Sequence, residues 1–408
     1  MPRTAAMLLI AVSLGAALIA QQGPGGQQGV PGGRGARGRP TTAIQPGEEC
    51  PAGMTLVRVG VCQAPEFPPP TIVDYRPKST LVIEQHPVPK AKFPVVDIHS
   101  HTAPTPETID QMVKEMDALN LRVLVIASNM SGDRLRTTLE TIRNSPHKDR
   151  FRVMAGVNFN NVGPGWSEKA LQQLDADIKA GSVGVGEINK SLGMTVKKAD
   201  GSRLKIDDPD LDPIWDAMAR MGLPVFIHTA EPQAFFDQPD NHNERLLELS
   251  LFDDRRNYTP GQVTFDELNA QRDNLFRKHP KTQFIMAHLG WHANNLPRLA
   301  KLLDTYPNVV TEMGAVLYDI GRQPRAAHDF FVKYQDRILF GKDTYAPVEF
   351  PYYWRVLETK DDYFDYYRDY HAFWKLYGID LPDAVLKKVY FQNAVRVTPG
   401  LPRTGWPQ

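Results

Sequence analysis

The chain has 408 residues, which is long enough for one large domain with a substantial core or for two smaller domains. Lysine and arginine together number 47, and so do aspartate and glutamate, so the formal net charge is zero and the sequence pI is about 7.2. Without a net field or a basic stripe with interleaved aromatics, we expect no nucleic-acid partner and no attraction to an anionic membrane surface.

Residues 1–20 have the composition of a secretory signal peptide. Arg3 precedes a run of apolar and small residues that is short for a membrane span. Leu18 stands where a small residue is preferred if cleavage follows Ala20, so an uncleaved anchor is the alternative interpretation. Cleavage would leave a secreted or periplasmic protein without a membrane segment.

A Gly/Pro-rich stretch follows over residues 21–48. It cannot bury enough apolar surface to order itself, so we expect a flexible linker. The chain has two cysteines, Cys50 and Cys62, and in an oxidising compartment so close a pair predicts a disulfide that closes a small hairpin. We assign this hairpin to an N-terminal extension over residues 49–92.

From residue 93 to residue 400, short apolar runs alternate with amphipathic stretches. The stretches carry apolar residues at helical spacing, as in the stripe Ile109, Met112, Val113, Met116 and Leu119 and in the stripe Leu171, Leu174 and Ile178 behind a Ser167 cap. The runs are aliphatic and β-branched enough for strands buried on both faces. The eight runs are VVDIHSH (95–101), RVLVIAS (122–128), RVMAGVNF (152–159), VGVGEIN (183–189), PVFIHT (224–229), QFIMAHLG (283–290), NVVTEMG (308–314) and RILFGKD (337–343).

Strands that alternate with helices pair in parallel, and eight such units predict a closed (β/α)8 TIM barrel, which is an α/β fold. An open doubly wound sheet is the alternative, but no GxGxxG sequence follows the first predicted strand. We therefore expect one barrel domain over residues 93–400, preceded by the N-terminal extension.

Polar side chains interrupt the apolar runs at the ends of the predicted strands, where TIM barrels place their chemistry. His99 and His101 share one face of the first strand, because successive side chains alternate. Two imidazoles on one face suit a metal better than a dry core. A lone buried histidine is usually a core residue, but convergence from several strands indicates a metal site. The other strand-end residues are Glu187, His228, His288 and Asp343.

These motifs resemble those of the amidohydrolase superfamily. The likeness rests on VVDIHSH, VFIHTAEP, FIMAHLGWH, RILFGKDTY and VYFQNAVRV. The closer similarity is to the amidohydrolase-related branch, which contains metal-dependent hydrolases and non-oxidative decarboxylases such as aminocarboxymuconate-semialdehyde decarboxylase. The resemblance implies a barrel enzyme that acts on a small molecule with the help of a metal.

Residue by residue, the resemblance implies a metal held by His99, His101, His228 and Asp343, with His288 as a catalytic acid–base residue beside it. Imidazole and carboxylate donors favour a single Zn2+ ion, with Mn2+ or Fe2+ as alternatives. Such an ion lowers the pKa of a bound water from about 15.7 toward 7. Asp343 would accept or steer the proton of this water, so we expect it to be catalytic as well as a ligand.

Glu187 has three interpretations, because it could bridge a second metal, contact the substrate or pair with Lys190. Asp97 shares the face of His99 one step deeper, where a structural role is expected. Arg322 and Arg325 follow the seventh strand and would clamp a substrate carboxylate, unless they are ordinary solvated arginines.

Two long connections bear on the substrate. The connection after the fifth strand, over residues 230–262, includes ERLLELSLF, which predicts a short lid helix. Aromatic residues are dense over residues 345–377, where they either line a substrate pocket or pack helices together.

The expected function is an exported, metal-dependent hydrolase that attacks an amide, ester or lactone of a small molecule. The alternative is a non-oxidative decarboxylase of an aromatic or unsaturated carboxylic acid, because decarboxylation uses nearly the same metal shell. A non-catalytic binding barrel is a third interpretation, although the expected site positions all carry chemically competent residues. A homo-oligomer is compatible with the sequence.

Overall fold

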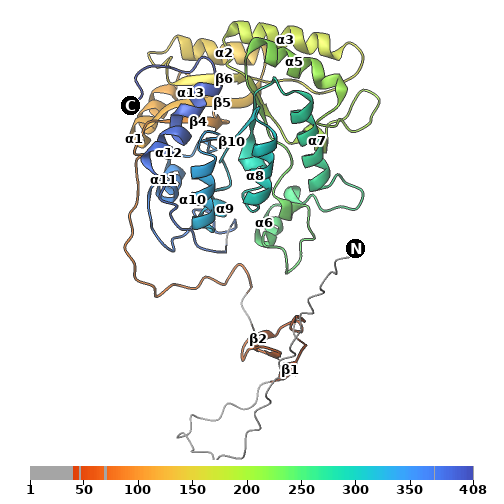
Figure 1. Ribbon diagram of the computed structural model, residues 1–408, viewed down its shortest axis with the longest axis vertical. Coiled ribbons are helices and arrows are strands. Elements are labelled where there is room, and N and C mark those ends of the chain that lie inside the picture. Colours follow the sequence, from red (N-terminus) through yellow and green to blue (C-terminus); the bar gives the residue numbers. More distant parts are fainter. Residues whose placement is uncertain (1–39, 46, 69–70, 372, 408) are drawn as a thin grey trace, which may run out of the picture. The chain divides into compact units, whose positions relative to one another are not determined.

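The computed structural model describes residues 40–45, 47–68, 71–371 and 373–407, so the expected signal peptide and most of the Gly/Pro-rich stretch lie outside the described residues. The chain divides into two units, Met1–Pro77 and Lys78–Gln408 (Figure 1). Residues 78–92, which we expected in the N-terminal extension, therefore group with the barrel. Side chains hold them there, since Asn120 Nδ2 donates to Ala91 O at 2.9 Å and His86 lies 2.6 Å from Asp361.

The first unit contains a small antiparallel sheet in the strand order β1-β3-β2. Its strands are β1 (Thr41–Ala43), β2 (Thr55–Arg58) and β3 (Val61–Gln63). Cys62, which is buried on β3, forms a disulfide with Cys50. Because a sheet of this size buries little apolar surface, we expect the covalent link to contribute much of its stability.

The second unit is a barrel of eight parallel strands, which run in sequence order around the sheet. Hydrogen bonds between its first and last strands close the barrel: Ile98 N–H donates to Phe340 O at 3.1 Å, and Asp343 N–H donates to His99 O at 2.8 Å. The predicted (β/α)8 barrel is therefore confirmed. The strands are β4 (Val95–Ser100), β5 (Leu121–Met130), β6 (Phe151–Ala155), β7 (Val185–Ile188), β8 (Val225–Ile227), β9 (Phe284–Met286), β10 (Val309–Glu312) and β11 (Ile338–Leu339).

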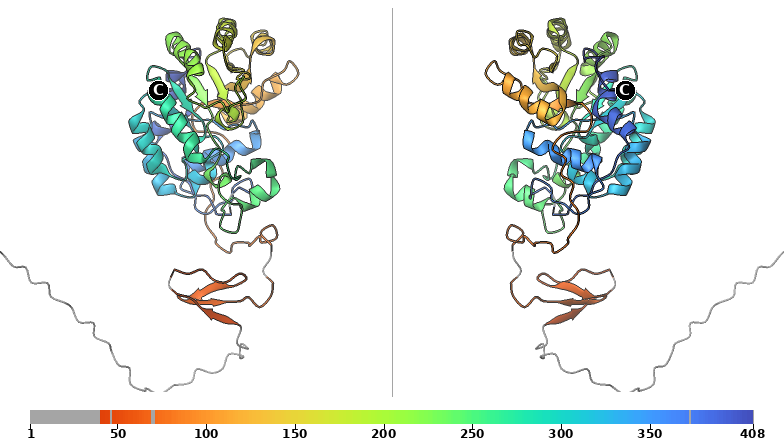
Figure 2. Two further views of the ribbon diagram at one scale, coloured as in Figure 1. Left: turned by 90° about the vertical axis from the view of Figure 1, so that its right-hand side faces the viewer. Right: turned by 90° about the vertical axis from the view of Figure 1, so that its left-hand side faces the viewer.

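Helices follow the strands and cover the outside of the barrel (Figure 2). The apolar stripe predicted between the first two strands is buried on α1. The predicted Ser167 cap is wrong, because Gly165, at a φ of 74°, precedes the first helical residue Trp166. The helices are α1 (Ile109–Leu119), α2 (Gly132–Arg143), α3 (Trp166–Ala180), α4 (Ser191–Met194), α5 (Asp212–Met221), α6 (Leu246–Leu251), α7 (Phe265–Lys278), α8 (Leu296–Thr305), α9 (Leu317–Gly321), α10 (Pro324–Lys333), α11 (Phe350–Glu358), α12 (Asp383–Lys387) and α13 (Asn393–Val397).

Short helical turns occur in several connections. The predicted short helix after the fifth barrel strand is present as α6. Among the described residues, none of the helices has the length and apolar character needed to cross a membrane. The short turns are η1 (Pro209–Leu211), η2 (Gln233–Phe235), η3 (Asp253–Arg255), η4 (Ala287–Trp291), η5 (Pro347–Glu349) and the π-turn η6 (Lys388–Gln392).

Candidate metal centre

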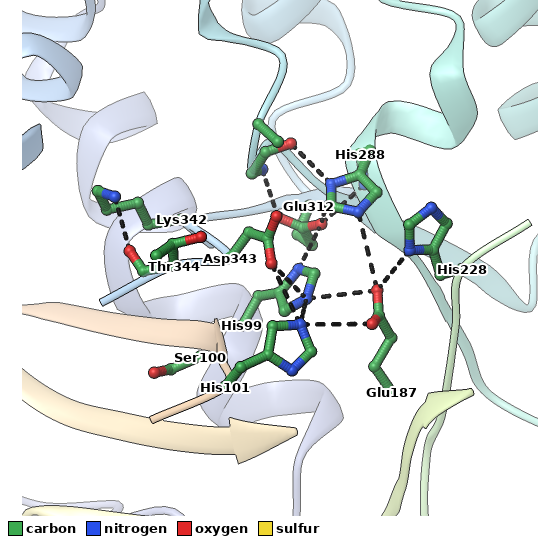
Figure 3. A network of polar contacts seen from close by, with 12 residues as sticks. His99, Ser100, His101, Glu187, His228, His288, Glu312, Lys342, Asp343 and Thr344 are labelled. Atoms are coloured by element: carbon green, nitrogen blue, oxygen red, sulfur yellow. Dashed lines mark hydrogen bonds and ion pairs between the residues drawn. The ribbon is translucent and has the colours of Figure 1, made fainter. Parts of the chain in front are cut away.

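Polar side chains from six barrel strands converge at the strand ends (Figure 3). Each strand is held by a parallel hydrogen-bond ladder, so the side chains start from a rigid frame. The His99 ring packs edge-on against Phe226 of β8, with ring centroids 4.7 Å apart. The converging residues are His99 on β4, His101 just after it, Glu187 on β7, His228 after β8, His288 after β9, Glu312 on β10 and Asp343 after β11.

Glu187 lies at the centre of this cluster. Its Oε1 is 2.9 Å from His228 Nδ1, 3.3 Å from His99 Nε2 and 3.7 Å from His288 Nε2. Its Oε2 is 3.4 Å from His101 Nε2. One buried carboxylate therefore faces four imidazoles.

His99, His101 and Asp343 form the open side of the cluster. His99 Nε2 is 3.2 Å from His101 Nε2, and Asp343 Oδ1 is 3.1 Å from His101 Nε2 and 3.6 Å from His99 Nε2. The side chains of His101 and Asp343 are 41% and 29% exposed, whereas that of His99 is fully buried. A solvent molecule or substrate would therefore enter beside His101 and Asp343.

A left-handed turn over residues 288–291 positions His288. The four φ angles are 55°, 50°, 62° and 56°, a region that residues other than glycine rarely adopt. Tertiary contacts hold the turn: His288 N–H donates to Glu312 Oε1 at 2.7 Å, and Trp291 Nε1–H lies 3.2 Å from Ala230 O. The turn brings His288 Nε2 toward Glu187 and buries the imidazole.

The bonding of His288 sets its chemical role. His288 Nδ1 lies 2.8 Å from Gly314 O, which can only accept, so Nδ1 carries the proton and Nε2 keeps its lone pair. Burial, and after it repulsion from His228, lowers the pKa of His288 to about 4. His288 is therefore neutral at pH 7 and presents an acceptor to the cluster.

The carboxylates of the cluster are ionised. Burial raises the pKa of Glu187, but the imidazoles of His228 and His99 outweigh burial and hold this pKa well below its usual range. Burial also raises the pKa of Asp343, and the hydrogen bond with His101 outweighs it, so the pKa of Asp343 is lowered. Burial lowers the pKa of His99, but the negative charges of Glu187 and Glu312 outweigh burial and raise this pKa well above its usual value. Ionised carboxylates that attract positive charge in this way favour a bound cation.

The donor set fits a divalent metal ion. Glu187 Oε1 is buried, and although nitrogens of His228 and His99 lie 2.9 and 3.3 Å from it, within the described part of the chain no donor meets it at hydrogen-bonding geometry. A buried carboxylate oxygen in this state is costly unless a cation completes its surroundings. Mixed imidazole and carboxylate donors suit Zn2+, Mn2+ or Fe2+. Two triads bring one donor atom from each residue within 4.8 Å of the others: His99, His101 and Asp343, and His99, Glu187 and His288.

These distances bear on the roles expected for two histidines. His288 belongs to one of the triads, whereas His228 belongs to neither. His228 Nδ1 is nevertheless the nitrogen nearest to Glu187, at 2.9 Å. Both imidazoles can therefore reach an ion in the cluster, and the division into a ligand His228 and a non-ligand His288 stays a prediction.

Lys190 does not pair with Glu187, which removes one of the three interpretations of that carboxylate. Lys190 Nζ instead pairs with the buried Glu231, whose other oxygen is 3.8 Å from His228 Nε2. The Lys190 side chain is 41% exposed and lies within electrostatic reach of Glu187 and Asp343. Lys190 is thus a cation at the rim of the cluster.

Neither of the two arginines expected at the substrate contacts the cluster within the described part of the chain, and Arg322 pairs with other carboxylates. Arg322 donates to both oxygens of Glu244, at 2.8 and 3.1 Å, and lies 2.7 Å from Asp319. Both terminal nitrogens of its guanidinium are therefore engaged by carboxylates of the protein itself. Arg325 is exposed and, among the described residues, makes no polar contact with the cluster.

Two buried carboxylates support the cluster from below, and sequence reasoning missed one of them. Glu312 stands near the end of the run NVVTEMG, as His228 does in PVFIHT, so the search for polar residues at strand ends would have found it. Asp97, for which a structural role was expected, accepts backbone N–H groups of His99 and Lys342, each at 3.1 Å. Burial raises the pKa of Asp97 to about 7.

Two cavities among the described residues do not include the metal-site donors in their walls. A cavity of about 200 Å³ lies between the ends of β5 and β6 and the start of α3, with Trp166 and Lys169 in its wall. A smaller one includes Arg245, Tyr318 and Trp291, and the indole of Trp291 lies 3.3 Å from His228 Nε2. The smaller cavity therefore adjoins the cluster through Trp291.

The chain is similar to one protein family and to several solved structures. The amidohydrolase family model matches residues 96–399, and no curated protein sequence matches the chain. An uncharacterised TIM-barrel protein from Bordetella bronchiseptica is 14% identical, with 74% of this chain and 97% of that chain covered and a TM-score of 0.47. Dihydroxybenzoic acid decarboxylase from Polaromonas sp., solved with bound manganese, is 14% identical over 75% of this chain and 96% of that chain, with a TM-score of 0.44. 4-Oxalomesaconate hydratase from Rhodopseudomonas palustris is 13% identical over 75% and 95%, also with a TM-score of 0.44.

The closed barrel and the donors at its strand ends define a TIM-barrel protein with a metal-type centre. Because the family model spans most of the chain, the chain belongs to amidohydrolase family 2. Members of this family are metal-dependent enzymes that act on small molecules.

Proposed function

We propose that this protein is an exported, metal-dependent hydrolase of an amide, ester or lactone. The observation that carries the proposal is the set of donors around Glu187, whose buried Oε1 lies close to imidazole nitrogens but meets none of the described donors at hydrogen-bonding geometry. His99, His101, His228 and Asp343 would hold one divalent ion, with Glu187 as a further ligand. When bound, the ion supplies a Lewis-acid charge that lowers the pKa of a water molecule in the site.

The chemistry of Asp343, His288 and Lys190 supports hydrolysis. Asp343 is ionised and partly exposed, so it can accept a proton from an attacking water. His288 Nε2 carries a lone pair, so it can take up this proton and return it to the leaving group. Lys190, at the rim, would attract a substrate that carries a carbonyl or carboxylate oxygen.

Decarboxylation stays the alternative reaction, because it uses nearly the same metal ligands as hydrolysis. An incubation of the metal-loaded protein with amides, esters, lactones and aromatic carboxylates in H2(18)O separates the two. Hydrolysis would place 18O in the acyl product. Release of carbon dioxide from a carboxylate, with no 18O in the organic product, would refute the hydrolase proposal.

The proposed location outside the cytoplasm is supported by the signal-like residues 1–20 and by the Cys50–Cys62 disulfide, since disulfides persist in oxidising compartments. Expression of the full chain with a reporter fused to its C-terminus would test it. Recovery of the reporter in the cytoplasmic fraction would contradict export.

A further inference from the structure

Glu312 occupies a position that the proposed chemistry does not use directly. Its side chain is fully buried at the end of β10. Oε1 lies 3.1 Å from His99 Nδ1 and accepts the backbone N–H of His288 at 2.7 Å, while Oε2 accepts the backbone N–H of Gly314. The Glu312 carboxylate therefore links three parts of the site. These are the expected ligand His99 on β4, the turn that carries His288, and the backbone just after β10.

Two glycines make room for this carboxylate. A Cβ at Gly314 would stand 2.8 Å from Glu312 Oε2, and a Cβ at Gly341 would overlap the same oxygen and stand 3.0 Å from His99 Cβ. Neither glycine has a positive φ angle, so neither is needed for a left-handed turn. The absence of a Cβ at these two positions therefore lets the backbone approach the Glu312 carboxylate closely.

The contact with His99 determines which ring nitrogen faces the metal site. Because a carboxylate only accepts, His99 Nδ1 carries a proton, which leaves Nε2 as the nitrogen that can offer a lone pair to an ion. His99 Nε2 is the atom that approaches Glu187, His101 and Asp343. A histidine with the opposite tautomer would present a proton to the ion.

We infer that Glu312 is a positioning residue that fixes the tautomer and orientation of His99 for metal binding and, through the backbone of His288, sets the second histidine against the same site. The inference rests on the proposed metal dependence. It adds a residue that touches neither the ion nor the substrate. Loss of such an outer carboxylate typically lowers metal affinity about 10- to 100-fold.

The test compares Zn2+ affinity of metal-free wild-type protein, Glu312→Gln, Glu312→Asp and Thr311→Val, measured by competition with a chromogenic chelator. Thr311→Val is the matched control, because Thr311 is a buried neighbour on β10 whose hydroxyl donates to Met286 O at 2.8 Å, away from the cluster. Glu312→Gln should bind Zn2+ about 10- to 100-fold more weakly, and Glu312→Asp, which keeps the charge, should recover part of the loss. Thr311→Val should keep wild-type affinity even if its melting temperature falls.

A second readout needs no metal. In 15N-histidine-labelled metal-free protein, the Nδ1–H resonance of His99 should report a strong hydrogen bond to a carboxylate in wild type and a weaker one in Glu312→Gln. Wild-type Zn2+ affinity in Glu312→Gln, or an equal loss in Thr311→Val, would overturn the inference. If the wild-type protein itself bound no divalent ion, the proposed function would fail. An unchanged Nδ1–H resonance of His99 in Glu312→Gln would overturn the inference separately.

Discussion

His228 and His288 approach the same oxygen of Glu187, but from different chemical surroundings. His288 is locked by Gly314 O with its Nε2 lone pair toward the cluster, whereas His228 directs Nδ1 to Glu187 and Nε2 toward Trp291 and Glu231. The four ligands expected from the resemblance already provide a tetrahedral set without His288. The role of each histidine therefore depends on whether the protein still binds the ion when that histidine is removed.

His288→Ala should keep most of its metal and lose about two or more orders of magnitude in turnover, the usual scale of a general acid–base group. His228→Ala should lose metal and turnover together, because it removes a ligand. Metal analysis in parallel with kinetics on the two variants checks this. A metal-free His288→Ala protein would show that His288 is a ligand and would contradict the assignment.

His292 offers a pH test away from the cluster. Burial, and after it the positive charge of Arg272, lowers the pKa of His292 to about 2. Between pH 6.5 and 2 the unfolded chain therefore binds a proton that the folded chain does not, so His292 stabilises the fold fully above pH 6.5 and progressively less as the pH falls.

The expected loss from His292 is about 1.4 kcal/mol in the free energy of unfolding per pH unit below pH 6. Urea denaturation of metal-free wild type and His292→Gln at pH 7, 6 and 5 measures it. The difference between the two proteins should shrink or reverse toward pH 5. A constant difference across this range would show that His292 is protonated in the folded state.

At the residue scale, most of the cluster could be predicted from the sequence, because polar residues near the ends of apolar runs stand out. Glu312 escaped because the run NVVTEMG was taken only as a strand. The partners of Lys190 and Arg322 could not be predicted, since Glu231 and Glu244 lie in a long connection whose path depends on tertiary packing.

The connections above the barrel are the elements that sequence patterns describe least well. The left-handed turn at residues 288–291 has no local signal apart from Gly290, because histidine, leucine and tryptophan do not favour positive φ angles. Tertiary contacts impose it: the buried Arg272 donates to Gly290 O at 3.3 Å, and Glu312 binds the His288 N–H. By contrast, the long helices and strands were predictable because their periodicity is local.

Glu248 on α6 ties two of these connections together. It binds Arg245 and Arg255 of its own connection and lies 3.3 Å from His371, which follows α11. Burial raises the pKa of Glu248, but the hydrogen bond from His371 and the charge of Arg245 outweigh it and bring the pKa to about 2. The carboxylate is therefore charged at all physiological pH values.

Glu248→Ala should lower the free energy of unfolding by about 3 to 5 kcal/mol, because it leaves the buried Arg245 without its counter-charge. Glu244→Ala is the control, since its pair with Arg322 is partly exposed and should be worth less than about 1 kcal/mol. Denaturation in urea measures both. Equal losses in the two variants would mean that burial does not set the strength of the Glu248 contacts.

At the scale of the whole molecule, the chain combines a small disulfide-closed sheet with a barrel that is an independent unit. Reduction should loosen residues 50–62 and leave the melting temperature of the barrel unchanged. Limited proteolysis with and without reductant, followed by calorimetry, checks this, and a Cys50→Ser/Cys62→Ser double variant should not respond to reductant. A reductant-dependent fall in the barrel transition of the wild type would contradict the independence of the two units.

The central claim is that the strand-end cluster of this barrel holds a divalent metal ion. Elemental analysis of purified wild-type protein and of His99→Ala tests it most directly, because His99 is fully buried and approaches Glu187, His101 and Asp343 at once. The wild type should carry about one equivalent of zinc, manganese or iron, and His99→Ala should carry almost none, since no neighbour can replace the lost ligand. Full metal occupancy in His99→Ala, or a wild-type protein that retains no ion after incubation with each of the three metals, would contradict the claim.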